Sequence, residues 1–128
     1  IDKRVFFKGK LSENKKNELL AKATIFIHPS LEDIFSLSLV EAAGAGVPCI
    51  VFDVEGNSEI FEDGKTGILV QKKDYFGLGD TINKTLDSPE LLEDISNHAK
   101  EMIPKKFNWE KTVKNLELCY FEVIKNKK

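Results

Sequence analysis

Short apolar runs alternate with longer amphipathic stretches along this chain. Runs bounded by charged residues, glycine or proline are typical of buried strands, and we expect strands at 5–7, 25–27, 49–52 and 68–70. Apolar residues at helical spacing predict helices that start near Ser12 and cover 36–45, 74–86, 88–103 and 110–124. This alternation predicts an α/β fold, a Rossmann-like doubly wound parallel sheet with helices on both faces.

The local signals also predict where the later elements end. Pro104 is expected to terminate the helix that begins after Ser88. Residues 54–58 are expected to form a loop before a short helical turn around Ile60. The last helix carries an apolar stripe at core spacing that is expected to be buried; it consists of Leu116, Cys119, Tyr120 and Val123. Phe107 and Trp109, just before this helix, are expected to hold it in place.

Composition narrows the class of protein. The 128 residues predict one domain, 1–128, and 19 basic against 21 acidic residues leave no broad positive field for nucleic acid. Cys49 and Cys119 lack metal-ligand spacing, so we expect reduced thiols, a cytoplasmic location and no bound metal. No apolar run has membrane-spanning length. Because the chain opens on IDKRVFFKG without an initiator Met, we expect it to be excised from a longer protein.

One charged residue interrupts an otherwise uncharged stretch. Between Asp33 and Asp53 only Glu41 carries a charge. A carboxylate within a buried apolar segment is costly unless a partner satisfies it. Glu41, with Asp33 eight positions before it, is therefore the main indication of function.

These two acids flank a loop expected at the carboxyl edge of the sheet. Ligands of such sheets bind at that edge, and the helix beginning at Ser36 would direct amide groups toward an anion such as phosphate. The carboxylates of Asp33 and Glu41 would repel an anion but accept hydrogen bonds from sugar hydroxyls. The residues thus predict a sugar-phosphate site.

Two long segments resemble the signatures of a known enzyme family. PSLEDIFSLSLVEAAGAGVPCIV and, further on, EGNSEIFEDGKTGILV are similar to the two signatures of retaining GT-B glycosyltransferases of the large family four, glycosyl transferases group 1. The flanking segments VFFKGKLSENKKNELLAKATIFIHPS and FNWEKTVKNLELCY match more loosely. The resemblance therefore covers nearly the whole chain.

The resemblance implies that the chain is the C-terminal, donor-binding half of such an enzyme. Asp33 would then act at the donor sugar as the catalytic-site acid, and Glu41 would bind the ribose. The backbone of the loop between them would meet the sugar and the diphosphate; that loop consists of Ile34, Phe35, Ser36 and Leu37. The donor would be a nucleotide-diphosphate sugar, used without cofactor or metal and with retention of anomeric configuration.

The resemblance also implies partners outside this chain. An N-terminal acceptor-binding domain and the Arg and Lys that bind the diphosphate would precede residue 1. The full-length bacterial enzyme would work in polysaccharide or glycoconjugate synthesis, in the cytoplasm or at the inner face of the membrane. This chain departs from the family pattern in having Asp33 where Glu is usual, Ile34 and Ser36 near the loop Phe where glycines are common, and Glu55 in the later loop.

Other interpretations stay open. Glu41 could be a structural carboxylate, and Asp33 a loop acid or a helix cap. His28 could face the sugar site, although a packed or solvent-facing histidine is the commoner case. Two other functions are a sugar-nucleotide epimerase half-domain and a non-catalytic α/β binding or regulatory module.

Overall fold

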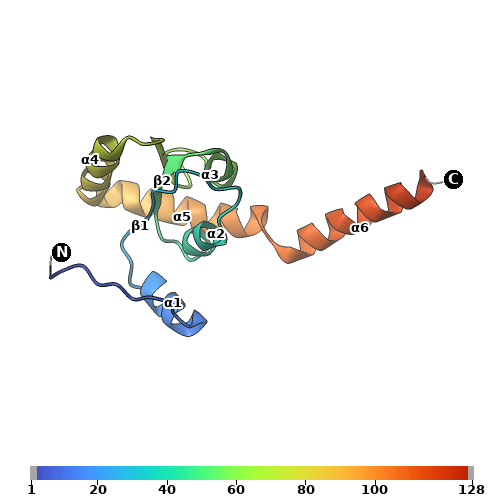
Figure 1. Cartoon of the computed structure of the whole chain (residues 1–128), viewed down its shortest axis with the longest axis horizontal. Helices are drawn as coiled ribbons and strands as arrows, with labels where there is room; N and C mark the ends of the chain where they lie inside the picture. Colours follow the sequence, from blue (N-terminus) through green and yellow to red (C-terminus); the bar gives the residue numbers. More distant parts are fainter. Residues whose placement is uncertain (1–2, 127–128) are drawn as a thin grey trace.

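The sheet at the centre of the molecule has three parallel strands in the order β1-β2-β3. The computed structural model describes residues 3–126. The strands are β1 (Phe26–His28), β2 (Cys49–Asp53) and β3 (Ile68–Gln71), with Ile27 opposite Ile50 and Val51 opposite Leu69. The helices are α1 (Glu13–Leu20), α2 (Leu37–Gly44), α3 (Glu55–Ile60), α4 (Tyr75–Leu86), α5 (Pro89–Lys106) and α6 (Trp109–Lys125). The predicted α/β fold with a parallel sheet is confirmed (Figure 1).

Helices cover both faces of this sheet, which explains why β2 is apolar throughout. Successive strand residues point to opposite faces. Cys49 and Val51 pack in one core cluster with residues of α2 and α5, whereas Ile50 and Phe52 pack in a second cluster with Leu78 of α4. All four strand residues are fully buried.

The prediction of a strand at residues 5–7 is wrong. Residues 5–9 form no regular element, and the side chains of Phe6 and Phe7 are 71% and 82% exposed. Figure 1 shows this segment leading toward α1 and lying away from the sheet. A strand exists through its hydrogen bonds to a neighbour, and β1 pairs only with β2 among the described residues. Apolar composition alone therefore did not produce a strand.

Two predicted boundaries also need correction. Residues 55–58 belong to α3 rather than to a loop, because the helix begins directly after Val54. Pro104 lies inside α5, which continues to Lys106. Proline lacks the amide that an interior helical position donates, but the amide of Phe107 still reaches the carbonyl oxygen of Ile103 at 2.9 Å and closes the last turn.

The expected burial of α6 is the largest error. No residue of α6 is buried, and Leu116, Tyr120 and Val123 are at least half exposed. In Figure 1 the helix extends away from the sheet and the other helices. The prediction that Phe107 and Trp109 pin this helix is also wrong: Phe107 packs against the core, but Trp109 is 82% exposed and no residue of α6 is buried. Amphipathic spacing indicates a face that can be covered, but it does not supply the covering surface.

Candidate functional site

The loop between β1 and α2 lies at the carboxyl edge of the sheet, as the sequence predicted. His28 is the last residue of β1, and Ser36 is the N-cap residue of α2. Between them, the Oδ2 atom of Asp33 is 2.9 Å from Nε2 of His28, and both side chains are three-quarters or more buried. His28 therefore faces the predicted site, which is the less common of the two interpretations of this residue.

The main chain of this loop is held by α3. The amide of Gly56 donates a hydrogen bond to the carbonyl oxygen of Asp33 across 3.1 Å. A Cβ atom at position 56 would overlap the carbonyl oxygens of Asp33 and Ile34. Only glycine allows this close approach, so the two signature segments of the sequence meet at this point.

The remaining loop residues differ widely in exposure. Ile34 is 92% exposed and Leu37 is 70% exposed, while Phe35 is 40% exposed. Ser36 is buried, and its Oγ lies 2.9 Å from Oγ of Ser38 rather than capping an amide of α2. The predicted loop residues, 34–37, lead into the amino end of α2.

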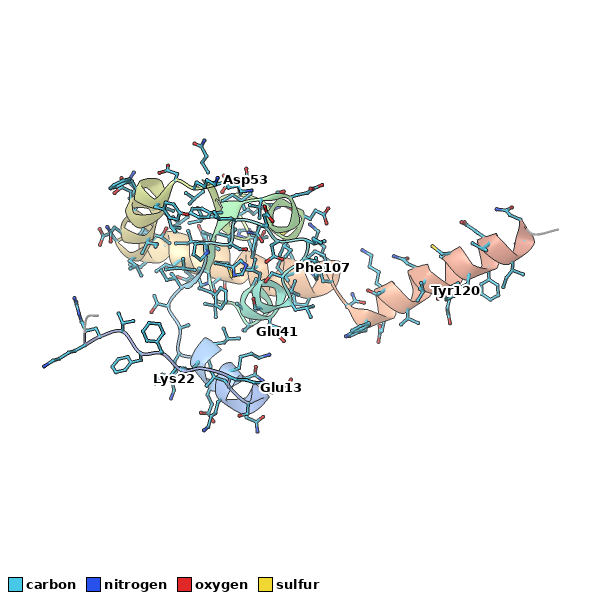
Figure 2. All side chains as sticks on the ribbon, viewed as in Figure 1. Glu13, Lys22, Glu41, Asp53, Phe107 and Tyr120 are labelled. Atoms are coloured by element: carbon cyan, nitrogen blue, oxygen red, sulfur yellow. The ribbon has the colours of Figure 1, made fainter. Side chains whose placement is uncertain are left out.

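Glu41 is not the buried carboxylate that the sequence led us to expect. Its side chain is 47% exposed, and its Oε1 accepts a hydrogen bond from Nζ of Lys16 of α1 at 2.7 Å. Figure 2 shows Glu41 at α2 with its side chain drawn. It projects from the outer face of α2, and its neighbours Ala42 and Ala43 form the buried face. Asp33 and Glu41 therefore have different partners, His28 and Lys16, and no hydrogen bond joins them among the residues described.

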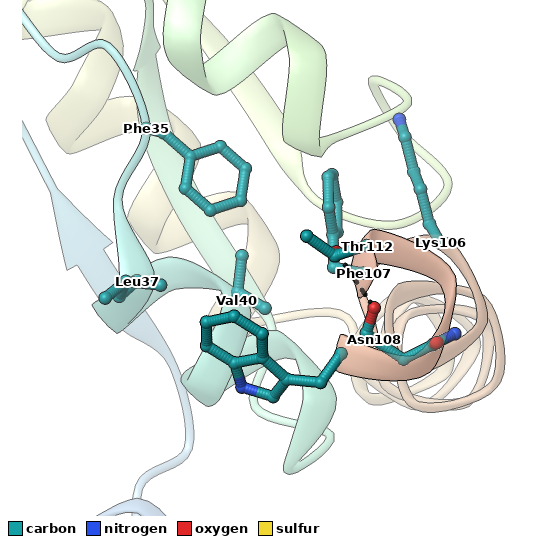
Figure 3. A pocket seen from close by; sticks show the side chains of 8 residues that line it. Phe35, Leu37, Val40, Lys106, Phe107, Asn108 and Thr112 are labelled. Atoms are coloured by element: carbon teal, nitrogen blue, oxygen red, sulfur yellow. Dashed lines mark hydrogen bonds between the residues drawn. The ribbon is translucent and has the colours of Figure 1, made fainter. Parts of the chain in front are cut away.

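A cavity of about 320 Å³ opens beside the loop (Figure 3). Phe35 and Leu37 of the predicted site line it, and the ring of Phe35 meets that of Phe107 edge to face with centroids 5.2 Å apart. The other lining residues come from α2 and from the junction of α5 and α6; they are Val40, Lys106, Asn108, Trp109 and Thr112. Sequence reasoning missed this cavity because it gave Phe107 and Trp109 a purely structural role.

Residues that could hold a metal do not gather in this region. Within residues 3–126, no three His, Cys, Asp or Glu side chains lie close enough together to bind a metal ion. Over the same residues, no helix is both long and apolar enough to cross a membrane.

Solved structures share this fold. Sucrose-phosphate synthase from Thermosynechococcus elongatus is 25% identical to this chain, with a TM-score of 0.88. The match covers 96% of this chain and 31% of the synthase chain. Alr3699/HepE from Anabaena, solved in complex with UDP-glucose, is 22% identical to this chain, with a TM-score of 0.81. The match covers 98% of this chain and 33% of the HepE chain. A parallel sheet with helices on both faces and a loop at its carboxyl edge defines an α/β domain of the kind found in GT-B glycosyltransferases.

Sequence comparison identifies the family. Residues 1–102 match the family model described as Glycosyl transferases group 1, and the chain belongs to this family. N-acetyl-alpha-D-glucosaminyl L-malate synthase of Bacillus anthracis is 34% identical over 128 residues, which are all of this chain and 33% of that protein. A UDP-Gal:alpha-D-GlcNAc-diphosphoundecaprenol alpha-1,3-galactosyltransferase of Escherichia coli is 27% identical over 109 residues, or 85% of this chain and 28% of that protein. The chain therefore spans about a third of these curated relatives.

Proposed function

We propose that this chain is the donor-binding half of a retaining GT-B glycosyltransferase of family four, which transfers a sugar from a nucleotide-diphosphate sugar to an acceptor. The observation that carries the proposal is the contact between the two signature segments at Gly56 and Asp33. This contact fixes the backbone of the loop that would receive the donor. Membership of the glycosyl transferases group 1 family supports the reaction class over an epimerase or a non-catalytic module.

The loop would position the donor in two ways. The amino end of α2 would direct backbone amides toward the diphosphate and stabilise it as it leaves. The carboxylate of Asp33 would accept hydrogen bonds from hydroxyls of the sugar, which orients the reacting carbon. No cofactor and no metal are assigned to this reaction, and the cations that bind the diphosphate are assigned to the upstream domain.

Glu41 is assigned to the ribose. Its carboxylate is half exposed, so it is accessible to a ligand, but in this structure it binds Lys16. An exposed ion pair of this kind contributes about 0–1 kcal/mol, so ribose hydroxyls can replace the lysine at little cost. A uridine nucleotide is the first donor to test, because the Anabaena neighbour was solved with UDP-glucose.

We also propose that the rest of the enzyme covers α6. The chain spans about a third of its curated relatives, and the apolar stripe of α6 has no covering surface among the described residues. An N-terminal acceptor-binding domain of the same protein would bury this stripe and complete the site. As a separate part of the proposal, the enzyme acts in the cytoplasm or at the inner membrane face, in glycoconjugate or polysaccharide synthesis.

The test is made in the full-length protein, with Glu41→Ala and Lys16→Ala as a matched pair. If Glu41 binds ribose, Glu41→Ala raises KM for the UDP-sugar at least tenfold, whereas Lys16→Ala leaves KM unchanged. If Glu41 serves only to pair with Lys16, both variants behave alike, which contradicts the assignment. Isothermal titration of the isolated chain with UDP should show weak binding, and the isolated chain should transfer no sugar.

A further inference from the structure

The carboxylate of Asp33 is held on one side only. Its Oδ2 atom is 2.9 Å from Nε2 of His28, and its Oδ1 atom has no hydrogen-bond partner among residues 3–126. An ionised carboxylate offers acceptor sites on both oxygens. One oxygen is thus engaged by the protein, and the other is left to accept a hydrogen bond from a ligand.

The group that holds Asp33 sits on a rigid element. His28 ends β1 and lies opposite Val51 of the fully buried central strand β2. Asp33, by contrast, lies in an irregular loop whose neighbouring side chain, Ile34, is 92% exposed. Sites are more precise when strands or helices supply the supporting group than when loops do.

The main chain and the side chain of Asp33 are therefore fixed independently. Gly56 holds its carbonyl oxygen from α3, and His28 holds its carboxylate from β1. The hydrogen bond from Gly56 acts on the main chain of Asp33 and does not set the rotamer of its side chain. The contact with His28 acts on the carboxylate itself and favours one of the staggered rotamers of this side chain.

We propose that His28 is a positioning residue for Asp33, which holds the carboxylate in the rotamer that presents Oδ1 to the hydroxyls of the donor sugar. This inference rests on the proposed function, because it concerns the orientation of the donor. His28 itself takes no part in the chemistry; it acts through Asp33. Loss of the contact should reduce the fraction of donor bound in the reactive orientation and leave the nucleotide part of the donor bound as before.

The experiment uses the full-length enzyme with a UDP-sugar donor. His28→Leu removes the hydrogen bond while keeping an apolar body of similar size, and His28→Gln keeps an N–H donor at a similar distance from the backbone. His98→Leu is the matched control, since His98 is an exposed histidine of α5 bonded to the carbonyl oxygen of Asp94. For each variant, kcat and KM for the donor are measured together with the Kd for UDP.

The expected pattern separates positioning from folding. His28→Leu should lower kcat/KM for the donor by about 10- to 100-fold, since small misplacements of reacting groups cost this much. The Kd for UDP should stay within twofold, His28→Gln should recover most of the lost activity, and His98→Leu should match the wild type. In an Asp33→Asn background, His28→Leu should cause no further loss, because the two residues act as one unit.

Three results would overturn the inference. The first is a kcat/KM for the donor in His28→Leu that lies within twofold of the wild type. This result would disprove the role of His28 but leave the proposed function intact. The second is a loss that multiplies with that of Asp33→Asn, which shows that the two residues act independently. The third is a wild-type enzyme that neither binds UDP nor transfers sugar, which overturns the proposed function and this inference together.

Discussion

The amide nitrogen of Gly56 and the carbonyl oxygen of Asp33 are joined by a hydrogen bond of 3.1 Å. The two residues belong to the two segments that resemble family signatures, and one lies in α3 while the other lies in the loop before α2. The contact places a glycine of one segment against the acidic loop of the other. A Cβ atom at position 56 would overlap the carbonyl oxygens of Asp33 and Ile34, so this position has no room for a side chain.

Replacement of Gly56 should therefore damage both the fold and the site. Gly56→Ala places a methyl group against two carbonyl oxygens of the loop, and we expect the free energy of unfolding to fall by about 1–3 kcal/mol. Gly79→Ala is the control, because a Cβ at this α4 position meets nothing within 4 Å. That variant should be more stable by about 0.5–1 kcal/mol, since alanine favours the helix. Urea unfolding measures both values, and equal stability of the two variants would contradict the tight contact.

The exposed stripe of α6 should contribute little to the stability of the isolated chain. Leu116→Ala and Tyr120→Ala should each change the free energy of unfolding of residues 1–128 by no more than about 0.5 kcal/mol, because both side chains are at least half exposed. Leu39→Ala, in the core of α2, should cost about 2–5 kcal/mol. A loss above about 1 kcal/mol for Leu116→Ala would show that the stripe packs against the chain itself. The same variants in the full-length protein test whether the upstream domain covers α6.

The two cysteines should differ in reactivity. Cys119 is exposed on α6, whereas Cys49 is buried in β2 and its Sγ contacts the carbonyl oxygen of Val47 at 3.3 Å. Burial also raises the pKa of the Cys49 thiol to about 12, so the reactive thiolate is scarce in the folded chain. A thiol reagent at pH 8 should label one equivalent in the native protein and two after denaturation. Labelling of a Cys119→Ser variant in the native state would contradict the burial of Cys49.

The pKa of Cys49 also predicts how stability depends on pH. Because burial raises this pKa from its ordinary value of 9.0 to about 12, the unfolded chain loses the thiol proton before the folded chain does. This contribution to stability is therefore complete below pH 9 and is lost as the pH rises from 9 toward 12. In that interval this group should lower the free energy of unfolding by up to about 1.4 kcal/mol for each pH unit of increase. Urea unfolding of the wild type and of Cys49→Ala at several pH values isolates the effect, and equal slopes would disprove it.

The sequence by itself determined the elements whose signals are local. The uninterrupted apolar run of β2 required burial on both faces, and a parallel sheet between helices is the arrangement that provides it. Helix ends such as Asp74, whose side chain accepts a hydrogen bond from the amide of Gly77, also depend on neighbours in the sequence. The candidate loop at 33–37 followed from the same logic, because it connects a predicted strand to a predicted helix.

Only the tertiary structure decided which surfaces meet. Apolar patterns at 5–7 and along α6 indicate a preference for burial, but burial requires another segment to cover them, and no described residue does so. The same reason explains why the expected burial of Glu41 was wrong. An uncharged stretch of sequence does not reveal which face of the helix is turned outward, and in the structure α2 directs this carboxylate to Lys16. The contacts of Asp33 with His28 and Gly56 join separate elements across the sheet edge, and spacing along the chain does not encode such distances.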